Sequence, residues 1–317
     1  MSEPLAAGVD LGGTKIGVGI VTAGGRLLAH LRVPTGPERE AEAILADMAD
    51  AVRQALALAG LRPDDLEGVG LGSPAPLDMD AGVILETNNL LTLHGFPIVA
   101  RLSEAIGRPV VLNNDANCFG LAEALYGAGA GARVCCGFTL GTGLGGFLVL
   151  DGRLFDGPRG AAAEVWASPY QGDQIEEKVS GRGLARNYRK LTERVATAQQ
   201  VAALAREGDP DAREAWREFG ADLAVPIAWM CNALDPDLVV LGGSMAAAWD
   251  LFCETMLHQA AKYTNAVNRR AVRIVPGTLG DQAGVIGAAA LVFGKADAGR
   301  PPGTHGPRGP QPPVVEV

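Results

Sequence analysis

Apolar runs rich in β-branched residues alternate along this chain with stretches whose apolar positions recur every three or four residues. The short runs predict buried strands, and the periodic stretches predict helices that bury one face. Strands are expected at 6–21 (two strands joined by a turn), 26–33, 66–71, 110–112, 133–140, 147–150, 238–241 and 272–275. Helices are expected at 38–59, 98–106, 116–126, 211–234, 245–267 and 284–293. This alternation predicts an α/β protein.

Glycine and proline mark two of these helices. Gly60 follows the helix expected to end at Ala59, where a left-handed residue commonly terminates a helix. Pro226 lies inside the helix expected at 211–234, where its missing N–H predicts a kink or a break.

The strand expected at 110–112 ends abruptly in three polar residues, Asn113, Asn114 and Asp115. Ligands of open α/β sheets sit just beyond the carboxyl ends of the strands. A carboxylate flanked by amides at such a place is suited to accept a proton from a substrate hydroxyl. The alternative is that Asp115 only caps the helix that follows.

The segment 6–21 contains a glycine turn whose residues are suited to bind a phosphate. Gly12 and Gly13 let backbone N–H groups approach a phosphate, while Thr14 and Lys15 add a hydroxyl and a cation. Asp10 is suited to hold a hydrated Mg²⁺ nearby. The pattern is not a Walker loop, since no GxxxxGK[ST] occurs. The alternative is a hairpin turn without further function.

The same arrangement returns at 133–150. A strand leads into Gly141, Thr142 and Gly143, a second strand follows, and Asp151–Gly152 signals a further hairpin. Two phosphate-binding hairpins that face each other across a cleft are the device of the actin-like ATPase architecture. The repeat is more informative than either turn alone.

Three further polar residues are candidates for contact with a substrate. Ser73 lies in the proline-rich loop 72–76, and Asn88 and Asn89 interrupt an apolar region. The two asparagines either meet a substrate or serve the geometry of a turn.

Charge and composition exclude several classes of partner. The chain has 317 residues with 27 basic and 36 acidic side chains, a net charge of −9, which argues against nucleic acid or an anionic membrane. The five cysteines form no CxxC pair, and we find no signal segment and no apolar run long enough to span a bilayer. We therefore expect a cytoplasmic protein.

Taken together, the motifs resemble the ROK family of sugar kinases over roughly Ala7 to Phe293. Segment 10–15 resembles its first phosphate motif, and 113–117 its catalytic segment. Segment 140–146, followed by 151–152 and 160–164, resembles its second phosphate motif and signature. Segment 241–244 resembles its nucleotide-side glycine pair.

The resemblance implies a role for each matching residue. Asp115 would be the base that takes the proton from the sugar 6-hydroxyl, and Asp10 would orient Mg²⁺. Asn114, Glu164 and Glu176 would bind sugar hydroxyls, with Asn89 and Ser73 as further substrate-binding candidates. The residues that would bind ATP are Asp10, Gly12, Gly13, Thr14, Lys15, Gly141, Thr142, Gly143, Gly242 and Gly243.

One departure from the family pattern stands out. The family commonly continues its signature with a histidine and a cysteine cluster that bind zinc, and Ala167 stands in place of that histidine. No Cys or His lies between Glu164 and Gly181, so this segment holds no thiolate or imidazole zinc site. Trp166 either offers an apolar face to a sugar or, as the simpler interpretation, belongs to the core.

The resemblance implies the actin-like, ribonuclease-H-like fold with a cleft between two domains. We expect a small domain at 1–116 plus 284–295, a large domain at 117–283 and a disordered Gly/Pro-rich tail at 296–317. The expected reaction is ATP- and Mg²⁺-dependent phosphorylation of a hexose, first of all glucose. Fructose, mannose and N-acetylated hexosamines are the alternatives, and a homodimer is implied.

Two other functions compete with a kinase. Some ROK relatives are sugar-responsive repressors with an N-terminal helix-turn-helix domain, for which the first phosphate strand leaves no room here. A sugar-binding pseudokinase is the other alternative, and the intact Asp115 and both glycine turns argue against it.

Overall fold

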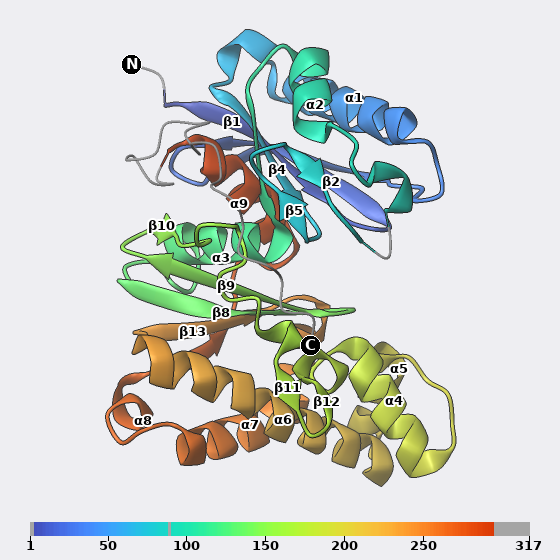
Figure 1. Cartoon of the computed structure of the whole chain (residues 1–317), viewed down its shortest axis with the longest axis vertical. Helices are drawn as coiled ribbons and strands as arrows, with labels where there is room; N and C mark the ends of the chain where they lie inside the picture. The colour runs from blue at the N-terminus through green and yellow to red at the C-terminus, as the bar shows by residue number, and fades with distance from the viewer. Residues whose placement is uncertain (1–2, 88–89, 295–317) are drawn as a thin grey trace, which may run out of the picture.

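Two mixed β-sheets lie one above the other, with helices between them and on both outer faces (Figure 1). This architecture is seen in the computed structural model, which describes residues 3–87 and 90–294. Asn88, the predicted substrate-binding residue Asn89 and the whole predicted tail lie outside these ranges.

The first sheet has the strand order β3-β2-β1-β4-β7. Its strands are β1 (Leu5–Leu11), β2 (Lys15–Thr22), β3 (Leu27–Pro34), β4 (Gly68–Ser73) and β7 (Val110–Asn114). β1, β2 and β3 are antiparallel neighbours, whereas β4 and β7 run parallel to β1.

The second sheet repeats this plan in the order β10-β9-β8-β13-β14. Its strands are β8 (Val134–Leu140), β9 (Leu144–Leu150), β10 (Arg153–Leu154), β13 (Leu238–Gly242) and β14 (Arg273–Pro276). Here too the first three strands in chain order are antiparallel, and β13 and β14 run parallel to β8. The repeat predicted from the two glycine turns is therefore a repeat of the whole sheet topology.

The helices form three layers around the sheets (Figure 1). They are α1 (Ala41–Ala59), α2 (Ile98–Ile106), α3 (Asp115–Tyr126), α4 (Gly181–Thr192), α5 (Ala198–Glu207), α6 (Pro210–Leu234), α7 (Trp249–Tyr263), α8 (Asn268–Ala271) and α9 (Ala283–Val292). α1 and α2 cover the outer face of the first sheet, and α6 and α7 cover that of the second. α3 and α9 lie between the sheets.

Short elements complete the fold. Two small hairpins pair β5 (Leu77–Asp78) with β6 (Val83–Ile84), and β11 (Pro169–Tyr170) with β12 (Asp173–Gln174). Single 3₁₀ turns lie at η1 (Pro63–Asp65), η2 (Leu91–Leu93), η3 (Val165–Ala167), η4 (Ile175–Glu177), η5 (Ser244–Ala248) and η6 (Gly280–Gln282).

Glycines allow the two inner helices to approach the sheets closely. A methyl group at Gly70 would lie 1.7 Å from the carbonyl oxygen of Ala288 in α9, and one at Gly8 would lie 1.9 Å from that of Val285. Such distances are far below van der Waals contact, so side chains are excluded at both positions. The glycines in these strands therefore set how near α9 lies to the first sheet.

Most predicted elements are confirmed, with two instructive differences. α6 continues through Pro226, so the predicted break is wrong. The missing N–H removes one bond, but the helix is held by the apolar core it shares with β8, β13 and α7. β9 starts at Leu144 rather than Phe147, because Gly145 and Gly146 already pair with Thr139 and Phe138.

Candidate active site

Strand register brings the first polar cluster together. Asp10 on β1 is level with Gly72 on β4, and Gly72 is level with Asn113 on β7. Neighbouring strands are about 4.8 Å apart, so this row places Asp10 and Asn113 about 10 Å from each other across the glycine. Both lie at the carboxyl ends of parallel strands, which the sequence predicted for Asn113.

Asn114, and not Asp115, caps α3. The Asn114 Oδ1 accepts hydrogen bonds from the backbone N–H groups of Ala116 at 2.7 Å and Asn117 at 3.3 Å. The alternative that Asp115 is the N-cap is therefore wrong. Asp115 is the first residue of the helix, partly exposed, and its carboxylate also accepts from the Ala116 N–H at 2.7 Å.

The surroundings of Asp115 favour a proton acceptor. Burial raises the pKa of Asp115 to about 7, and the nearby carboxylates of Asp10 and Glu164 push it in the same direction. The hydrogen bond from Ala116 opposes this shift. A base works best when its pKa lies near the working pH, since it is then ionised and still basic enough to take a proton.

Glu164, which directly precedes η3 in the segment after β10, reaches the same cluster. A methyl group at Gly146 of β9 would lie 2.0 Å from the carbonyl oxygen of Ala163, so the chain crosses β9 in close contact there. The Asn114 Nδ2 donates to the Glu164 Oε1 at 3.2 Å. Burial raises the pKa of Glu164, and a hydrogen bond from the Trp166 side chain opposes that rise.

Trp166 does not belong to the core. Its side chain is 36% exposed and interacts with Glu164, so the simpler interpretation from sequence is wrong. Ala167, beside it in η3, is exposed as well. These two residues form surface next to a carboxylate of the site.

Asn113 organises a smaller network behind Asp115. Its Oδ1 accepts from the backbone N–H of Asn114 at 2.7 Å and from the Asn117 Nδ2 at 2.9 Å. Its Nδ2 donates to the Asp156 Oδ2 at 3.2 Å. Sequence reasoning missed Asp156, because an Asp-Gly pair after a strand is also ordinary turn chemistry.

Ser73 is fully buried, and its hydroxyl donates to the carbonyl oxygen of Pro74 at 3.3 Å. The side chain has no exposed surface in this structure, and a role of Ser73 in substrate binding stays a prediction. Ser73 is the last residue of β4, level with Asn114, rather than part of the loop that follows. The parallel pairing continues two residues beyond the predicted strand end at Leu71, and Ser73 is buried there.

The first glycine turn closes on itself. The Gly12 N–H donates to the Lys15 carbonyl oxygen at 3.0 Å. Thr35, just after β3, donates its hydroxyl to the Gly12 oxygen at 2.7 Å and its N–H to the Thr14 oxygen at 3.1 Å. Within the described residues, no hydrogen bond uses the N–H of Gly13 or Thr14. These two groups remain to face a phosphate.

The second glycine turn has the same plan. The Gly141 N–H donates to the Gly143 oxygen at 3.0 Å, and the N–H groups of Thr142 and Gly143 take part in no hydrogen bond within the described ranges. Beyond the turn, a methyl group at Gly145 would lie 2.6 Å from the Ala116 side chain. The second hairpin therefore lies directly against the first turn of α3, next to Asp115.

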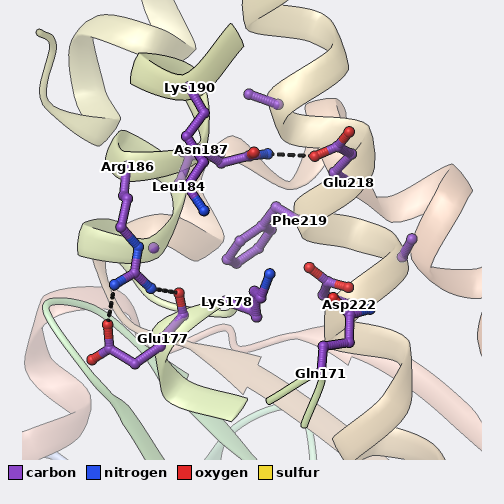
Figure 2. A pocket seen from close by; sticks show the side chains of 13 residues that line it. Gln171, Glu177, Lys178, Leu184, Arg186, Asn187, Lys190, Glu218, Phe219 and Asp222 are labelled. Atoms are coloured by element: carbon purple, nitrogen blue, oxygen red, sulfur yellow. Dashed lines mark hydrogen bonds and ion pairs between the residues drawn. The ribbon is translucent and has the colours of Figure 1, made fainter. Parts of the chain in front are cut away.

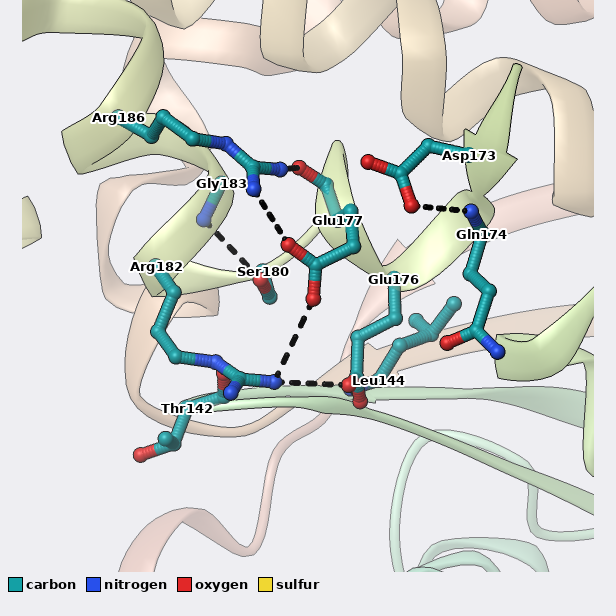
Figure 3. Close-up of polar contacts among 10 residues, drawn as sticks. All are labelled: Thr142, Leu144, Asp173, Gln174, Glu176, Glu177, Ser180, Arg182, Gly183 and Arg186. Carbon is teal, nitrogen blue, oxygen red and sulfur yellow. Dashed lines mark hydrogen bonds and ion pairs between the residues drawn. The ribbon is translucent and has the colours of Figure 1, made fainter. Parts of the chain in front are cut away.

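A charged pair supports this second turn (Figure 3). The Glu176 Oε2 accepts from the Leu144 N–H at 2.9 Å, and its Oε1 pairs with the Arg182 Nη2 at 2.8 Å. The Arg182 Nε also donates to the Thr142 oxygen at 3.3 Å, and the Gly181 N–H donates to the Gly141 oxygen at 2.8 Å. Arg182 is a second residue that sequence reasoning missed.

The glycine pair at the end of β13 lies beside this turn. Gly242 is level with Thr139 of β8, and a methyl group on Gly242 would lie 2.0 Å from the Phe119 ring. Gly243 has a φ of 82°, and a methyl group there would lie 2.4 Å from the Leu140 oxygen. Gly242 is buried, whereas Gly243 is exposed. Both positions require glycine on steric grounds alone.

Asp10 fits a cation held through water. Burial raises the pKa of Asp10 although Lys15 and Arg32 act to lower it, so the carboxylate is incompletely compensated. A methyl group at Gly284, at the start of α9, would lie 2.7 Å from the Asp10 Oδ2. A hydrated divalent cation would supply the missing charge at a site of this chemistry. The exposed Lys15 adds a cation on the turn side.

No direct protein cage for a metal is present in the described part of the chain, since no three His, Cys, Asp or Glu side chains are grouped suitably. The segment after Ala167 instead forms the β11–β12 hairpin. Its Tyr170 hydroxyl donates to the Asp222 Oδ1 of α6 at 2.8 Å. Among the described helices, none has the length and apolar character needed to cross a bilayer.

Comparison with known proteins agrees with this geometry. The chain is 31% identical to a glucokinase from Halalkalibacterium halodurans, over 92% of this chain and 96% of that one. It is 34% identical to an N-acetyl-D-glucosamine kinase from Vibrio cholerae, over 90% and 98%.

The fold matches solved structures as well. A ROK family glucokinase from Streptomyces griseus, solved in complex with glucose and AMPPNP, superposes with a TM-score of 0.78 at 28% identity, covering 90% of this chain and 98% of that one. The two-domain, actin-like sugar kinase fold expected from the sequence is confirmed. The family model described as ROK family matches residues 6–295, which takes in both sheets and every residue of the site. This chain therefore belongs to the ROK family.

Proposed function

We propose that this protein is a sugar kinase that transfers the terminal phosphoryl group of ATP to the 6-hydroxyl of a hexose, with glucose as the first candidate. The observation that carries the proposal is the partly exposed Asp115, with its pKa raised to about 7, against the second glycine turn and near Asp10. A base between two phosphate-binding turns matches phosphoryl transfer, where catalysis consists mainly of positioning and charge stabilisation.

Each residue near Asp115 receives a role in this proposal. Asp115 accepts the proton of the sugar hydroxyl as the new bond to phosphorus forms. Asn114 and Glu164 hold neighbouring sugar hydroxyls, since their mutual hydrogen bond leaves one amide hydrogen and carboxylate lone pairs available. Glu176 can accept a further sugar hydroxyl while it holds the second turn, because a carboxylate oxygen accepts more than one hydrogen bond.

The nucleotide is proposed to lie along the two turns. The free N–H groups of Gly13, Thr14, Thr142 and Gly143 would bind its phosphates, with Gly243 on the adenosine side. Asp10 would hold Mg²⁺ through water, and the ion would neutralise phosphate charge when bound. The glucokinase solved with AMPPNP, a close analogue of ATP, supports this choice of donor.

N-acetylglucosamine is the second candidate substrate. The N-acetyl-D-glucosamine kinase of Vibrio cholerae is 34% identical to this chain, slightly more than the 31% of the Halalkalibacterium glucokinase. The small, exposed Ala167 beside Trp166 leaves surface next to Glu164 without a large side chain. Glucose and N-acetylglucosamine are therefore the two sugars to compare first.

A coupled assay of ADP release tests the reaction, with ATP, Mg²⁺ and a panel of glucose, N-acetylglucosamine, mannose and fructose. Mass spectrometry of the product identifies the phosphorylated sugar. We expect Asp115→Asn to lower kcat by about 10²–10⁴ while leaving the dissociation constant of the sugar within a few-fold. Near-normal turnover of Asp115→Asn would refute the assignment of the base. A folded protein that turns over none of the sugars would refute the proposed function.

A further inference from the structure

A pocket is lined in part by the segment that supports the second glycine turn. It has a volume of about 320 Å³ and opens between η4, α4 and α6 (Figure 2). The Phe219 ring, nearly fully buried, and Leu184 form its apolar floor. Its charged lining residues are Glu177, Lys178, Arg186, Lys190, Glu218 and Asp222. None of these residues has a role in the proposed transfer.

The acidic groups of this pocket already have partners. Glu177 pairs with the Arg186 Nη1 at 2.6 Å, and the Asn187 Nδ2 donates to Glu218 at 2.6 Å. Asp222 accepts from the Tyr170 hydroxyl, and burial raises the pKa of Asp222. The three carboxylates equal the three cations of the lining in number, and each carboxylate already accepts a hydrogen bond.

Two of the three cations are ammonium groups. Among the described residues, Lys178 and Lys190 make no hydrogen bond or ion pair shorter than 4 Å, although Lys178 interacts with Asp222 at longer range. Figure 2 shows the Lys178 side chain directed to the space beside Phe219. An anion placed there would meet the two lysines above an apolar floor and would compete with Asp222 for Lys178. The amides of Gln171 and Asn187 in the wall are suited to bind hydroxyls.

The pocket is connected to the second turn by a ladder of ion pairs (Figure 3). Arg186 in the pocket wall holds Glu177 at 2.6 Å, and Glu177 lies 3.8 Å from the Arg182 Nη2. Arg182 in turn holds Glu176 and the Thr142 oxygen of the turn. A change in the partner of Arg186 therefore alters the charge next to Arg182.

We propose that this pocket binds a small phosphate monoester of a polyol and thereby weakens the grip of the second turn on nucleotide. The phosphate lies between Lys178 and Lys190 and competes with Glu177 for Arg186. Glu177 then moves toward Arg182, which loosens its contacts with Glu176 and Thr142. The effect on nucleotide rests on the proposed function, whereas binding to the pocket does not.

Calorimetric titration of the full-length protein tests the binding, with inorganic phosphate, glycerol 3-phosphate and glucose 6-phosphate as probes and glycerol as the uncharged control. Saturating AMPPNP fills any nucleotide site, and each titration is repeated without it. We expect glycerol 3-phosphate or glucose 6-phosphate to bind with a millimolar or lower dissociation constant, and more tightly than inorganic phosphate.

The double variant Lys178→Gln with Lys190→Gln should weaken this binding at least tenfold, with an unchanged melting temperature. Lys262→Gln, an exposed lysine of α7 outside the pocket, is the matched control and should bind as the wild type does. Equal binding by wild type and double variant, or no binding by either, would overturn the site.

Steady-state kinetics tests the coupling. A bound ester should raise the KM for ATP by up to about twofold in the wild type at low salt and leave it unchanged in the double variant. A rise that persists in the double variant would mean competition at the nucleotide site and would overturn the coupling. Absence of any turnover with intact lysine-dependent binding would refute the kinase proposal and leave the pocket standing.

Discussion

In the first glycine turn, the carbonyl oxygens of Gly12 and Thr14 are held by the hydroxyl and N–H of one neutral residue, Thr35. In the second turn, the corresponding support is charged. Glu176 holds the Leu144 N–H, and Arg182 holds both Glu176 and the Thr142 oxygen. Each turn nevertheless leaves two consecutive N–H groups without a partner in the described chain.

This difference follows from where each support comes from. Thr35 continues β3, a neighbour of the first hairpin in its own sheet, so its bonds extend regular pairing. Glu176 and Arg182 come from η4 and α4, which belong to the segment inserted between β10 and β13. The first turn is thus part of the rigid sheet, whereas the second depends on exposed ion pairs that salt, pH or a ligand can change.

The largest expected effect concerns Asp115, the proposed base between the two turns. Because only the ionised carboxylate accepts a proton, kcat should fall about tenfold per pH unit below the Asp115 pKa of about 7. A pH profile of kcat between pH 5 and 8.5 at saturating ATP and sugar measures this. A kcat that does not change with pH over that range would show that ionisation of Asp115 does not control the reaction.

Stability gives an independent check on the same pKa. A folded pKa raised above the unfolded value of 3.8 means that the folded protein binds more protons between pH 4 and 7, so the free energy of unfolding falls as pH rises through that window. Asp115→Asn should remove this contribution. Its melting temperature should therefore exceed that of the wild type at pH 8 by more than at pH 4.5.

The second prediction contrasts two glycines of the second turn. A methyl group at Gly143 would lie 2.4 Å from the Glu176 Oε2, whereas at Gly141 nothing lies within 4 Å. Gly143→Ala should therefore push Glu176 off the Leu144 N–H and lower kcat/KM for ATP about tenfold, or about 1.4 kcal/mol, roughly the loss of one charge-assisted hydrogen bond. Gly141→Ala is the matched control and should change it less than threefold. Equal effects of both variants would argue against support of the second turn by Glu176.

A third prediction addresses the first turn. Thr35→Val keeps the shape of the side chain and removes the hydrogen bond to the Gly12 oxygen. Loss of about 1 kcal/mol should raise the KM for ATP about fivefold. Because this support is neutral, the ratio of variant to wild type should be the same at 50 mM and 500 mM salt.

The smallest effect is expected at the charged support. The side chain of Arg182 is 53% exposed, so its pair with Glu176 contributes only about 0.5 kcal/mol at low salt. Arg182→Gln should raise the KM for ATP about twofold at 50 mM salt, and the difference should vanish at 500 mM. A salt-independent loss would show that the two turns are supported in the same way.

Local sequence patterns predicted much of the fold. The apolar period of α1 and the glycine after it predicted that helix to the residue at its end, because Gly60 adopts a φ of 70° at little cost. The repeated strand, glycine turn and strand predicted two equivalent hairpins, and both sheets have the same topology. Polar residues after the strand at 110–112 predicted a site at its carboxyl end.

The sequence pattern was less informative where contacts between residues distant in sequence decide which side chains are buried and which support the turns. Trp166 is exposed beside Glu164, although its residue type favoured the core, and Ser73 is buried, although its predicted place in a loop favoured the surface. Nothing near Arg182 or Thr35 in sequence marks them as supports of the glycine turns. Their partners lie 40 residues away for Arg182 and 23 residues away for Thr35.

The sequence by itself determined which residues could carry the chemistry: a carboxylate after a buried strand, and two glycine turns with backbone N–H groups to offer. These are local properties, since turn geometry and strand ends depend on neighbouring residues. The tertiary structure alone decided that Asn114 caps α3 and leaves Asp115 to face the site, and that Asp10 and Glu164 lie near it. Burial and charge at that position raise the Asp115 pKa to about 7, and both arise only when the two sheets enclose α3.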